Sequence, residues 1–191
     1  MARWEPNTAE RLVRAALDLF TEQGYDATTV SEIAARAGGL SKMTFFRYFA
    51  DKREVLFAGQ EAHRQLVTDA IAAAPAPATP LEAVAAALGA LGGSFTEDRR
   101  DIGARLLPVI AANGELRERA VAKRAALSEA MTAALEQRGV PGLPASLAAE
   151  LGTHAFYRAF AQWAGAAGGP PLTELTQRAF GEVRAAAASL G

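Results

Sequence analysis

The apolar residues of the chain recur at intervals of three and four positions, which places them on one face of an α-helix. In residues 8–23 one such stripe consists of Leu12, Ala15, Ala16, Leu19 and Phe20. Gly24 follows in the position that glycine favours after a helix end. The alternating apolar and polar pattern of a half-buried strand is missing from the sequence. The pattern therefore predicts an all-α fold.

Glycines, prolines and capping residues divide the chain into about nine helices. Thr29 with Glu32, and Thr79 with Glu82, have the spacing of a capping box, in which hydroxyl and carboxylate each satisfy a backbone N–H. Asn7, Ser41 and Asp51 are placed to cap further helices. We expect helices at residues 8–23, 29–37, 42–48, 51–73, 81–91, 97–112, 115–138, 144–166 and 172–188.

Composition narrows the class of protein. The 191 residues are 50% hydrophobic and 21% charged, which suffices for one large or two small packed domains. The formal net charge of −1 argues against binding a polyanion by bulk positive charge. The chain has no cysteine, which fits a reducing compartment, so we expect a cytoplasmic protein. We expect no signal peptide, because residues 1–7 lack its apolar core, and no membrane segment, because no run of about 18 apolar residues occurs.

Positive charge is nevertheless concentrated locally. Residues 36–53 contain one acidic residue, Asp51, and a set of basic residues made up of Arg36, Lys42, Arg47, Lys52 and Arg53. The local net charge is therefore +4. These residues lie on and around two short predicted helices joined by a glycine turn. In a helix-turn-helix the second helix enters the major groove and the basic face meets the phosphate backbone.

The same stretch resembles a known family. The matching segments read TTVSEIA at residues 28–34, AG at 37–38, SKMTFFRYF at 41–49 and DKREVL at 51–56. In order and spacing they are similar to the N-terminal domain of TetR-type transcriptional regulators, over about residues 8–57. The resemblance implies a three-helix DNA-binding domain at residues 1–57 and a larger helical domain for effector binding and dimerisation at residues 58–191. One departure is an extra glycine in the turn at Gly38-Gly39.

The resemblance also implies where DNA contacts lie. The start of the second helix would hold a phosphate, while Tyr48 and Lys52 would clamp the DNA backbone. On the third helix, the recognition helix, Lys42 can read guanine, and Met43 or Thr44 can touch a thymine methyl group or a phosphate. We expect Phe49, and either Phe45 or Phe46, to lie partly in the core, while Phe45 is a further candidate for facing DNA. The expected DNA-binding residues are Thr28, Thr29, Ser41, Lys42, Met43, Thr44, Phe45, Arg47, Tyr48 and Lys52.

For the second domain we expect a homodimer that binds a palindromic operator, with the last two helices as its seam. The expected dimer residues are Ala148, Leu151, Ala155, Ala159, Trp163, Leu175, Phe180 and Val183. The middle helices would enclose a pocket for a small apolar or aromatic effector, whose binding moves the fourth helix and releases a repressor from DNA. The expected pocket residues are His63, Leu66, Phe95, Leu106, Leu107, Ile110, Met131, Phe156, Tyr157 and Phe160.

Other functions receive less support from the sequence. An enzyme needs a nucleophile with its base, a metal cluster or a phosphate loop, and none is visible, so we expect no catalytic residues and no cofactor. His63 and His154 lack a second metal ligand at helical spacing apart from Glu150, which we interpret as an ordinary polar neighbour of His154. The remaining alternative is a helical dimer that acts as an adaptor or structural protein without specific DNA binding.

Overall fold

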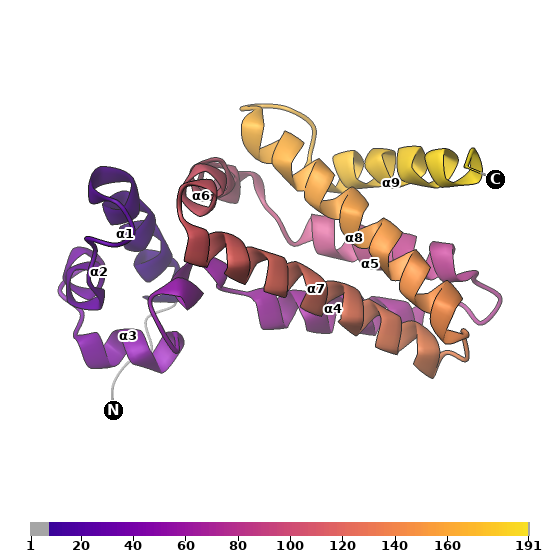
Figure 1. Cartoon of the computed structure of the whole chain (residues 1–191), viewed down its shortest axis with the longest axis horizontal. Coiled ribbons are helices and arrows are strands. Elements are labelled where there is room, and N and C mark those ends of the chain that lie inside the picture. The colour runs from indigo at the N-terminus through magenta and orange to yellow at the C-terminus, as the bar shows by residue number, and fades with distance from the viewer. Residues whose placement is uncertain (1–7, 191) are drawn as a thin grey trace. The chain divides into compact units, whose positions relative to one another are not determined.

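The structure is a computed structural model that describes residues 8–190, apart from the side chain of Asp98; Asn7, expected to cap the first helix, lies outside this range. The described residues form nine α-helices (Figure 1): α1 Thr8–Gln23, α2 Val30–Arg36, α3 Lys42–Tyr48, α4 Gln60–Ala73, α5 Pro80–Gly93, α6 Arg100–Ala112, α7 Gly114–Gln137, α8 Gly142–Gly165 and α9 Leu172–Ala188. Two short 3-10 helices, η1 Arg53–Phe57 and η2 Glu97–Arg99, complete them. The all-α fold is confirmed.

The chain divides into two compact units. The N-terminal unit contains residues up to Ala58 together with Ala104–Ala120, and the C-terminal unit contains Gly59–Gly103 and the residues from Val121 onward. The sequence predicted a boundary after residue 57. It did not predict that a segment comprising most of α6 and the start of α7 would join the N-terminal unit.

In the N-terminal unit, α1 packs against α2 and against η1, and α2 packs against α3. The core between them consists of buried apolar side chains, which include Leu12, Ala16, Leu17, Ile33, Ala34, Phe45 and Val55. The capping box of Thr29 and Glu32 is formed at the start of α2, and Ser41 caps α3 by accepting the N–H of Thr44. Both caps were predicted, because capping depends on residues within one helical turn.

The expected long fourth helix at residues 51–73 is wrong. Residues Arg53–Phe57 form a 3-10 turn, and α4 begins only at Gln60, after Gly59 with a φ of +83°. Val55, Leu56 and Phe57 are all buried, and three consecutive inward side chains do not fit one face of an α-helix. Asp51 still acts as a cap, accepting the N–H groups of Arg53 and Glu54 at 2.8 and 3.1 Å.

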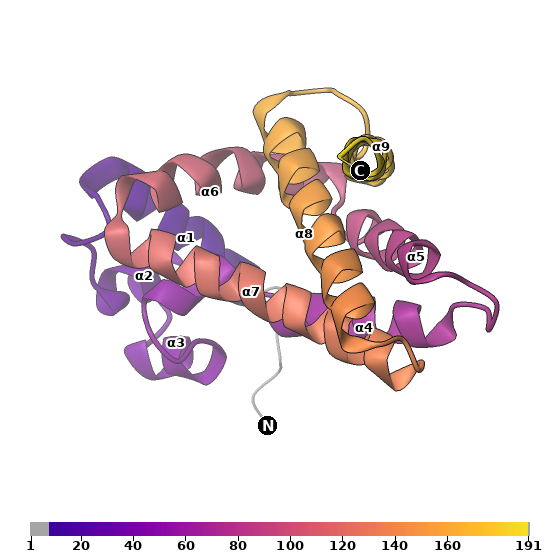
Figure 2. The same ribbon diagram turned by 45° about the vertical axis from the view of Figure 1, so that its right-hand side comes forward.

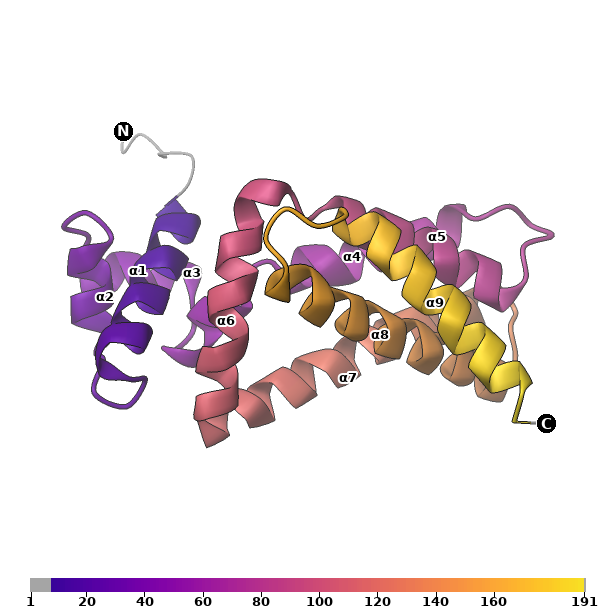
Figure 3. The ribbon, with the colours of Figure 1, turned by 90° about the horizontal axis from the view of Figure 1, so that it is seen from above.

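In the C-terminal unit, α5 packs against α4, α8 and α9, and α8 packs along α9. Figure 2 shows α9 nearly end-on beside α5, and Figure 3 shows α9 and α8 from above. Small residues permit the close approaches. A Cβ at Gly152 of α8 would overlap Val84 of α5, and a Cβ at Gly92 of α5 would lie 3.0 Å from the Cα of Thr173.

The end of α8 is held by Arg100, whose side chain is only 6% exposed. Its guanidinium donates to the carbonyl oxygens of Trp163 and Ala166 at 2.8 Å each, and to those of Gly169 and Pro170 at 3.0 Å each. Two further bonds join it to the carboxylate of Glu97 at 2.7 and 2.8 Å. Arg100 therefore satisfies carbonyl groups that the helix end leaves without intrahelical partners.

Within residues 8–190, no helix is long and apolar enough to cross a membrane.

Candidate nucleic-acid interface

The turn between α2 and α3 is built on two glycines in succession. Gly38 and Gly39 have φ angles of +102° and +72°, a region that residues with a Cβ rarely adopt. The N–H of Gly39 donates to the carbonyl oxygen of Ala35 at 2.8 Å, and that of Leu40 to Ala34 at 2.9 Å. The extra glycine is thus part of a hydrogen-bonded helix end, and only Leu40 and Ser41 separate it from the start of α3 at Lys42.

Helix α3 has a buried face and an exposed face. Phe45 and Phe49 are buried, with ring centres 5.4 Å apart. On the other side Lys42, Met43, Phe46 and Arg47 are exposed, and among them Met43 has an exposed fraction of 77% and Phe46 of 45%. Thr44 and Tyr48 are half-buried between the two faces.

Phe45 was expected to face DNA, and this prediction is wrong. Its side chain is 0% exposed and packs in the core of the N-terminal unit, so it cannot reach a ligand outside. Phe46, which the expected set omitted, is the aromatic residue on the exposed face. The available signal was the four-residue spacing of Phe45 and Phe49, which places those two rings on one side of a helix.

The start of α2 is closed by its own capping residues. Thr28 is 1% exposed and its hydroxyl donates to the carbonyl oxygen of Gly24 at 2.8 Å, so the prediction that it holds a phosphate is wrong. Thr29 is exposed, but its backbone N–H and hydroxyl both donate to the carboxylate of Glu32 at 2.7 Å. These bonds lower the pKa of Glu32, the one from the hydroxyl most, so a negative charge already occupies the position expected for a phosphate.

Lys52 was expected to clamp the DNA backbone, but its ammonium group donates hydrogen bonds to backbone carbonyl groups of the protein itself. Nζ donates to the carbonyl oxygens of Tyr25 and Thr28 at 2.7 and 2.9 Å, and the side chain is half-buried. It also lies 4.0 Å from the centre of the Tyr25 ring. Burial of the Tyr25 hydroxyl has the largest effect on its pKa, followed by the negative charge of Glu115, and together they raise this pKa to about 12.

Ion pairs reduce the local positive charge of residues 36–53. Arg36 forms two hydrogen bonds of 2.9 Å with the carboxylate of Glu22, and Arg53 pairs with Asp51 at 2.8 Å. These bonds lower the pKa of Glu22 and that of Asp51. Among residues 8–190, no carboxylate lies within ion-pair distance of Lys42 or Arg47, so both charges remain available on the exposed face of α3.

Comparison with known proteins decides what this helix-turn-helix is. Residues 12–58 match the family model described as bacterial regulatory proteins, tetR family. The helix-turn-helix of this chain belongs to the TetR family. This family consists of transcriptional regulators and not of enzymes.

Two curated relatives resemble part of this chain. The transcriptional regulator TcmR of Streptomyces glaucescens is 41% identical over 86 residues, which is 45% of this chain and 38% of the relative. The regulator BetI of Rhizobium meliloti is 42% identical over 83 residues, 43% of this chain and 40% of the relative. The matches thus span about two fifths of the length of these relatives.

Two solved structures of transcriptional regulators share the fold along almost the whole chain. FadR of Thermus thermophilus, a repressor in complex with lauroyl-CoA, is 25% identical with a TM-score of 0.54, over 92% of this chain and 93% of that one. FadR of Bacillus subtilis, in complex with stearoyl-CoA, is 20% identical with a TM-score of 0.60, over 91% and 96%. The second similarity concerns the fold alone.

Part of the expected effector pocket forms an aromatic cluster in the C-terminal unit. The ring of Phe95 lies 4.9 Å from His63, 5.9 Å from Phe156, 5.5 Å from Phe160 and 6.0 Å from Trp163, measured between ring centres. Burial in the first place, and Arg99 in the second, lower the pKa of His63.

Three other expected pocket residues, Leu66, Met131 and Tyr157, lie in the same unit. Tyr157 packs against Phe156 and under Arg124; its pKa is raised by burial. Met131 is buried and Leu66 half-buried. Ser128, which was not predicted, is also buried, and its hydroxyl donates to the carboxylate of Glu150 at 2.7 Å.

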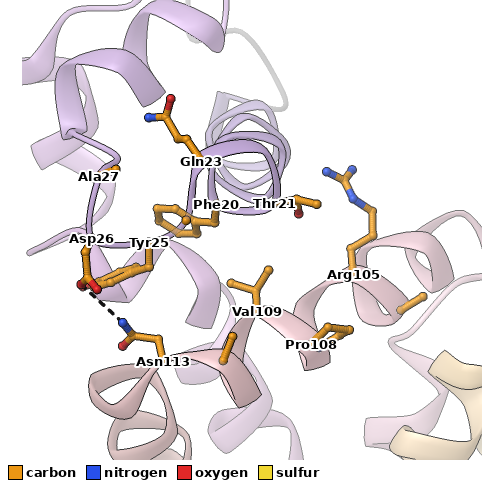
Figure 4. Close-up of a pocket in the computed structure, with 13 residues that line it drawn as sticks. Phe20, Thr21, Gln23, Tyr25, Asp26, Ala27, Arg105, Pro108, Val109 and Asn113 are labelled. Atoms are coloured by element: carbon orange, nitrogen blue, oxygen red, sulfur yellow. Dashed lines mark hydrogen bonds between the residues drawn. The ribbon is translucent and has the colours of Figure 1, made fainter.

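The remaining expected pocket residues, Leu106, Leu107 and Ile110, belong to the N-terminal unit and are not part of the aromatic cluster. A cleft of about 680 Å³ lies in that unit instead, and the sequence did not predict it. Figure 4 shows its apolar wall of Phe20, Tyr25, Pro108 and Val109. At one end Asn113 donates to Asp26 at 3.4 Å.

The expected dimer residues lie mostly inside the C-terminal unit. All of them except the half-buried Leu151 are buried within a single chain, in the packing of α8 and α9 on each other and on α5. The stripe of small and large residues was correctly identified as a packing face, but its partner is the chain itself. The buried side chains of this stripe therefore do not form part of the surface of the single chain.

Within the described residues, no group of three or more histidine, aspartate or glutamate side chains is arranged to hold a metal ion. His154 and Glu150 are exposed on α8, and the carboxylate of Glu150 accepts from Ser128.

Proposed function

We propose that the protein is a sequence-specific DNA-binding transcriptional regulator. In this proposal it is a repressor that binds a palindromic operator as a homodimer and is released by a small apolar or aromatic effector. The observation that carries the proposal is the exposed face of α3, where no carboxylate of the described residues pairs with Lys42 or Arg47 and where Met43 and Phe46 are exposed beside them. A regulator of this kind acts in the cytoplasm, where it can reach DNA.

The face of α3 has the properties that a DNA-reading helix needs. An α-helix fits the major groove of B-form DNA, and positive side chains there replace counterions condensed on the phosphates. Lys42 and Arg47 supply such charges. A core residue, Phe45, fixes the rotation of α3 about its axis, so that the same four side chains always face outward.

For the homodimer we propose an interface formed by the outward faces of α8 and α9. Leu143 and Leu147 are one helical turn apart on α8 and are 72% and 55% exposed, which is unusual for leucine on a helix that is otherwise packed. We expect Leu147→Glu to convert the dimer into a monomer in sedimentation equilibrium. Val121→Glu, at a valine of α7 that is 69% exposed, is the matched control and should stay dimeric.

The effector site that we propose is the aromatic cluster around Phe95. An apolar or aromatic ligand gains free energy by burying its surface among such rings. FadR of Thermus thermophilus is a repressor in complex with lauroyl-CoA, and the apolar chain of that ligand agrees with this class. A ligand that prefers one position of α4 would shift the population away from the DNA-binding state.

The experiment that tests the function is selection of bound sequences from random duplex DNA by the purified full-length protein at a fixed salt concentration. We expect a palindromic motif whose half-sites are about 10 base pairs apart, or a multiple of this, because the two recognition helices of a dimer are related by a two-fold axis. A folded, dimeric protein that enriches no sequence would contradict the proposal and favour the adaptor alternative.

A further inference from the structure

The exposed side chains of α3 follow a definite order around the helix. An α-helix turns by about 100° per residue, so Lys42, Phe46, Met43 and Arg47 succeed one another over an arc of about 140°. Phe46 and Met43 occupy the middle of this arc, and the two cations occupy its edges. The burial agrees with this order, because all four side chains are exposed while Phe45, on the other side, is buried.

The middle of the arc offers no strong hydrogen-bonding group. A phenyl ring has none, and a thioether sulfur is only a weak acceptor. The nearby hydroxyls are used by the helix cap: Oγ of Ser41 accepts the backbone N–H of Thr44 at 3.1 Å and lies 3.0 Å from Oγ1 of the same threonine. Lys42 leans towards Phe46, with Nζ 5.8 Å from the ring centre.

In the major groove the base edges present hydrogen-bond donors, acceptors and one apolar group, the C5-methyl of thymine. When α3 lies in the groove, the middle of its exposed arc faces the base edges and the edges of the arc face the two phosphate walls. The cations are thus directed to phosphates and the apolar pair to bases. This assigns Lys42 a role different from the guanine contact expected from the sequence.

We propose that Met43 and Phe46 are specificity-determining residues that recognise thymine through its C5-methyl group, and that this recognition supplies much of the sequence preference in each half-site. The inference rests on the proposed function, because it requires that α3 enters the major groove of an operator. It names the chemistry of base reading on that same face.

The test uses the full-length protein and the operator obtained by selection. Each thymine of a half-site is replaced in turn by deoxyuridine, which lacks the methyl group but keeps the base pair and its hydrogen-bonding groups. We expect the dissociation constant, measured by fluorescence anisotropy, to rise about fourfold at one or two positions, the value for one buried methyl-sized group. If no deoxyuridine changes the dissociation constant by about twofold or more, the proposal is overturned.

Variants then assign each methyl contact to a side chain. Met43→Ala or Phe46→Ala should weaken binding to the thymine operator and abolish the difference between thymine and deoxyuridine at its own position. Phe46→Tyr, which keeps the ring, should retain that difference. Val121→Ala, at an exposed valine of α7, is the matched control and should leave both affinities unchanged. A difference that persists unaltered in both alanine variants would contradict the assignment.

The two proposals fail in different ways. If selection enriches no sequence, the proposed DNA-binding function itself fails. If selection yields an operator whose affinity does not depend on thymine methyl groups, the function stands and only the reading by Met43 and Phe46 fails. Met43 is exposed on a capped helix, so the melting temperature of Met43→Ala should match that of the unaltered protein. Phe46→Ala also loses the edge contact of its ring with Phe45, so its affinities are measured at a temperature where thermal unfolding shows the variant to be folded.

Discussion

The ammonium of Lys52 lies 4.0 Å from the centre of the Tyr25 ring and donates a hydrogen bond of 2.7 Å to the carbonyl oxygen of the same residue. These residues are 27 positions apart in the sequence, and the contact ties the chain after α3 to the turn that follows α1. A second bond to the carbonyl oxygen of Thr28 completes the attachment. Lys52 thus holds together the frame that carries α2 and α3.

We therefore expect Lys52→Ala to lower the free energy of unfolding by roughly 1–3 kcal/mol, because the variant loses charge-assisted hydrogen bonds to two carbonyl groups. Its effect on the salt dependence of DNA binding should be small. Arg47→Ala is the contrasting variant: it should keep the melting temperature and lower the slope of log K against log salt by about one. Thermal unfolding and binding titrations at several salt concentrations measure both. If Lys52→Ala lowered the slope of log K against log salt without changing the stability, Lys52 would contact a DNA phosphate and this account of it would be wrong.

The two glycines of the turn should respond differently to substitution. Gly38 has a φ of +102°, and a Cβ there would overlap the guanidinium of Arg11, which donates to the carbonyl oxygen of Ala37 at 3.0 Å. Gly39 also has a positive φ but has open space around it. We expect Gly39→Ala to cost about 1–2 kcal/mol of stability, from backbone strain alone, and Gly38→Ala to cost more. Urea unfolding of the two variants tests this order; equal costs would contradict it.

Arg100 should be a stability residue of the C-terminal unit. Arg100→Met keeps the apolar part of the side chain but leaves the carbonyl groups of Trp163, Ala166 and the loop before α9 without their donor. We expect a loss of roughly 2–4 kcal/mol, because buried acceptors become unpaired. Arg99→Met, at the exposed neighbouring arginine, is the matched control and should change stability little. Denaturant unfolding measures both variants, and equal midpoints would argue against the role of Arg100.

His63 gives the stability a dependence on pH near neutrality. Because burial and Arg99 lower the pKa of His63 in the folded protein below its ordinary 6.5, the unfolded chain takes up the proton first as pH falls. Stability is therefore complete above the ordinary pKa and decreases below it, until the folded-state His63 also protonates, with a slope of at most about 1.4 kcal/mol per pH unit.

We expect His63→Gln to remove this component of the pH dependence. His154→Gln, at a histidine that is exposed on α8, is the control and should retain it. Melting temperatures recorded between about pH 8 and about pH 5.5 measure the effect over the range where a histidine titrates. The same decrease in His63→Gln as in the unaltered protein would show that another group is responsible.

The helices and their caps could be predicted from the sequence because they depend on neighbours within one turn. Thr29 with Glu32, and Thr79 with Glu82, form the expected capping boxes. The interruption before α4 was missed, although the successive apolar residues Val55, Leu56 and Phe57 and the following Gly59 were a local signal for it.

The roles of individual site residues depend on contacts between distant segments. The rotation of α3 decides that Phe46 and not Phe45 is exposed, and this rotation is set by the packing of α3 in the core. The pairing of Arg36 with Glu22 and the bonds of Lys52 to the turn after α1 remove two charges from the expected basic face. The stripe on α8 and α9 was visible in the sequence, but its partner, α5 of the same chain, was not.

The measurement that tests the central claim most directly compares the affinity of the full-length protein for its selected operator with its affinity for a scrambled duplex of the same length and base composition, at one salt concentration near the physiological value. A sequence-specific regulator should bind the operator at least about a thousandfold more tightly. A ratio near one, from a folded dimer, would contradict the account and leave only the contribution of the phosphate backbone.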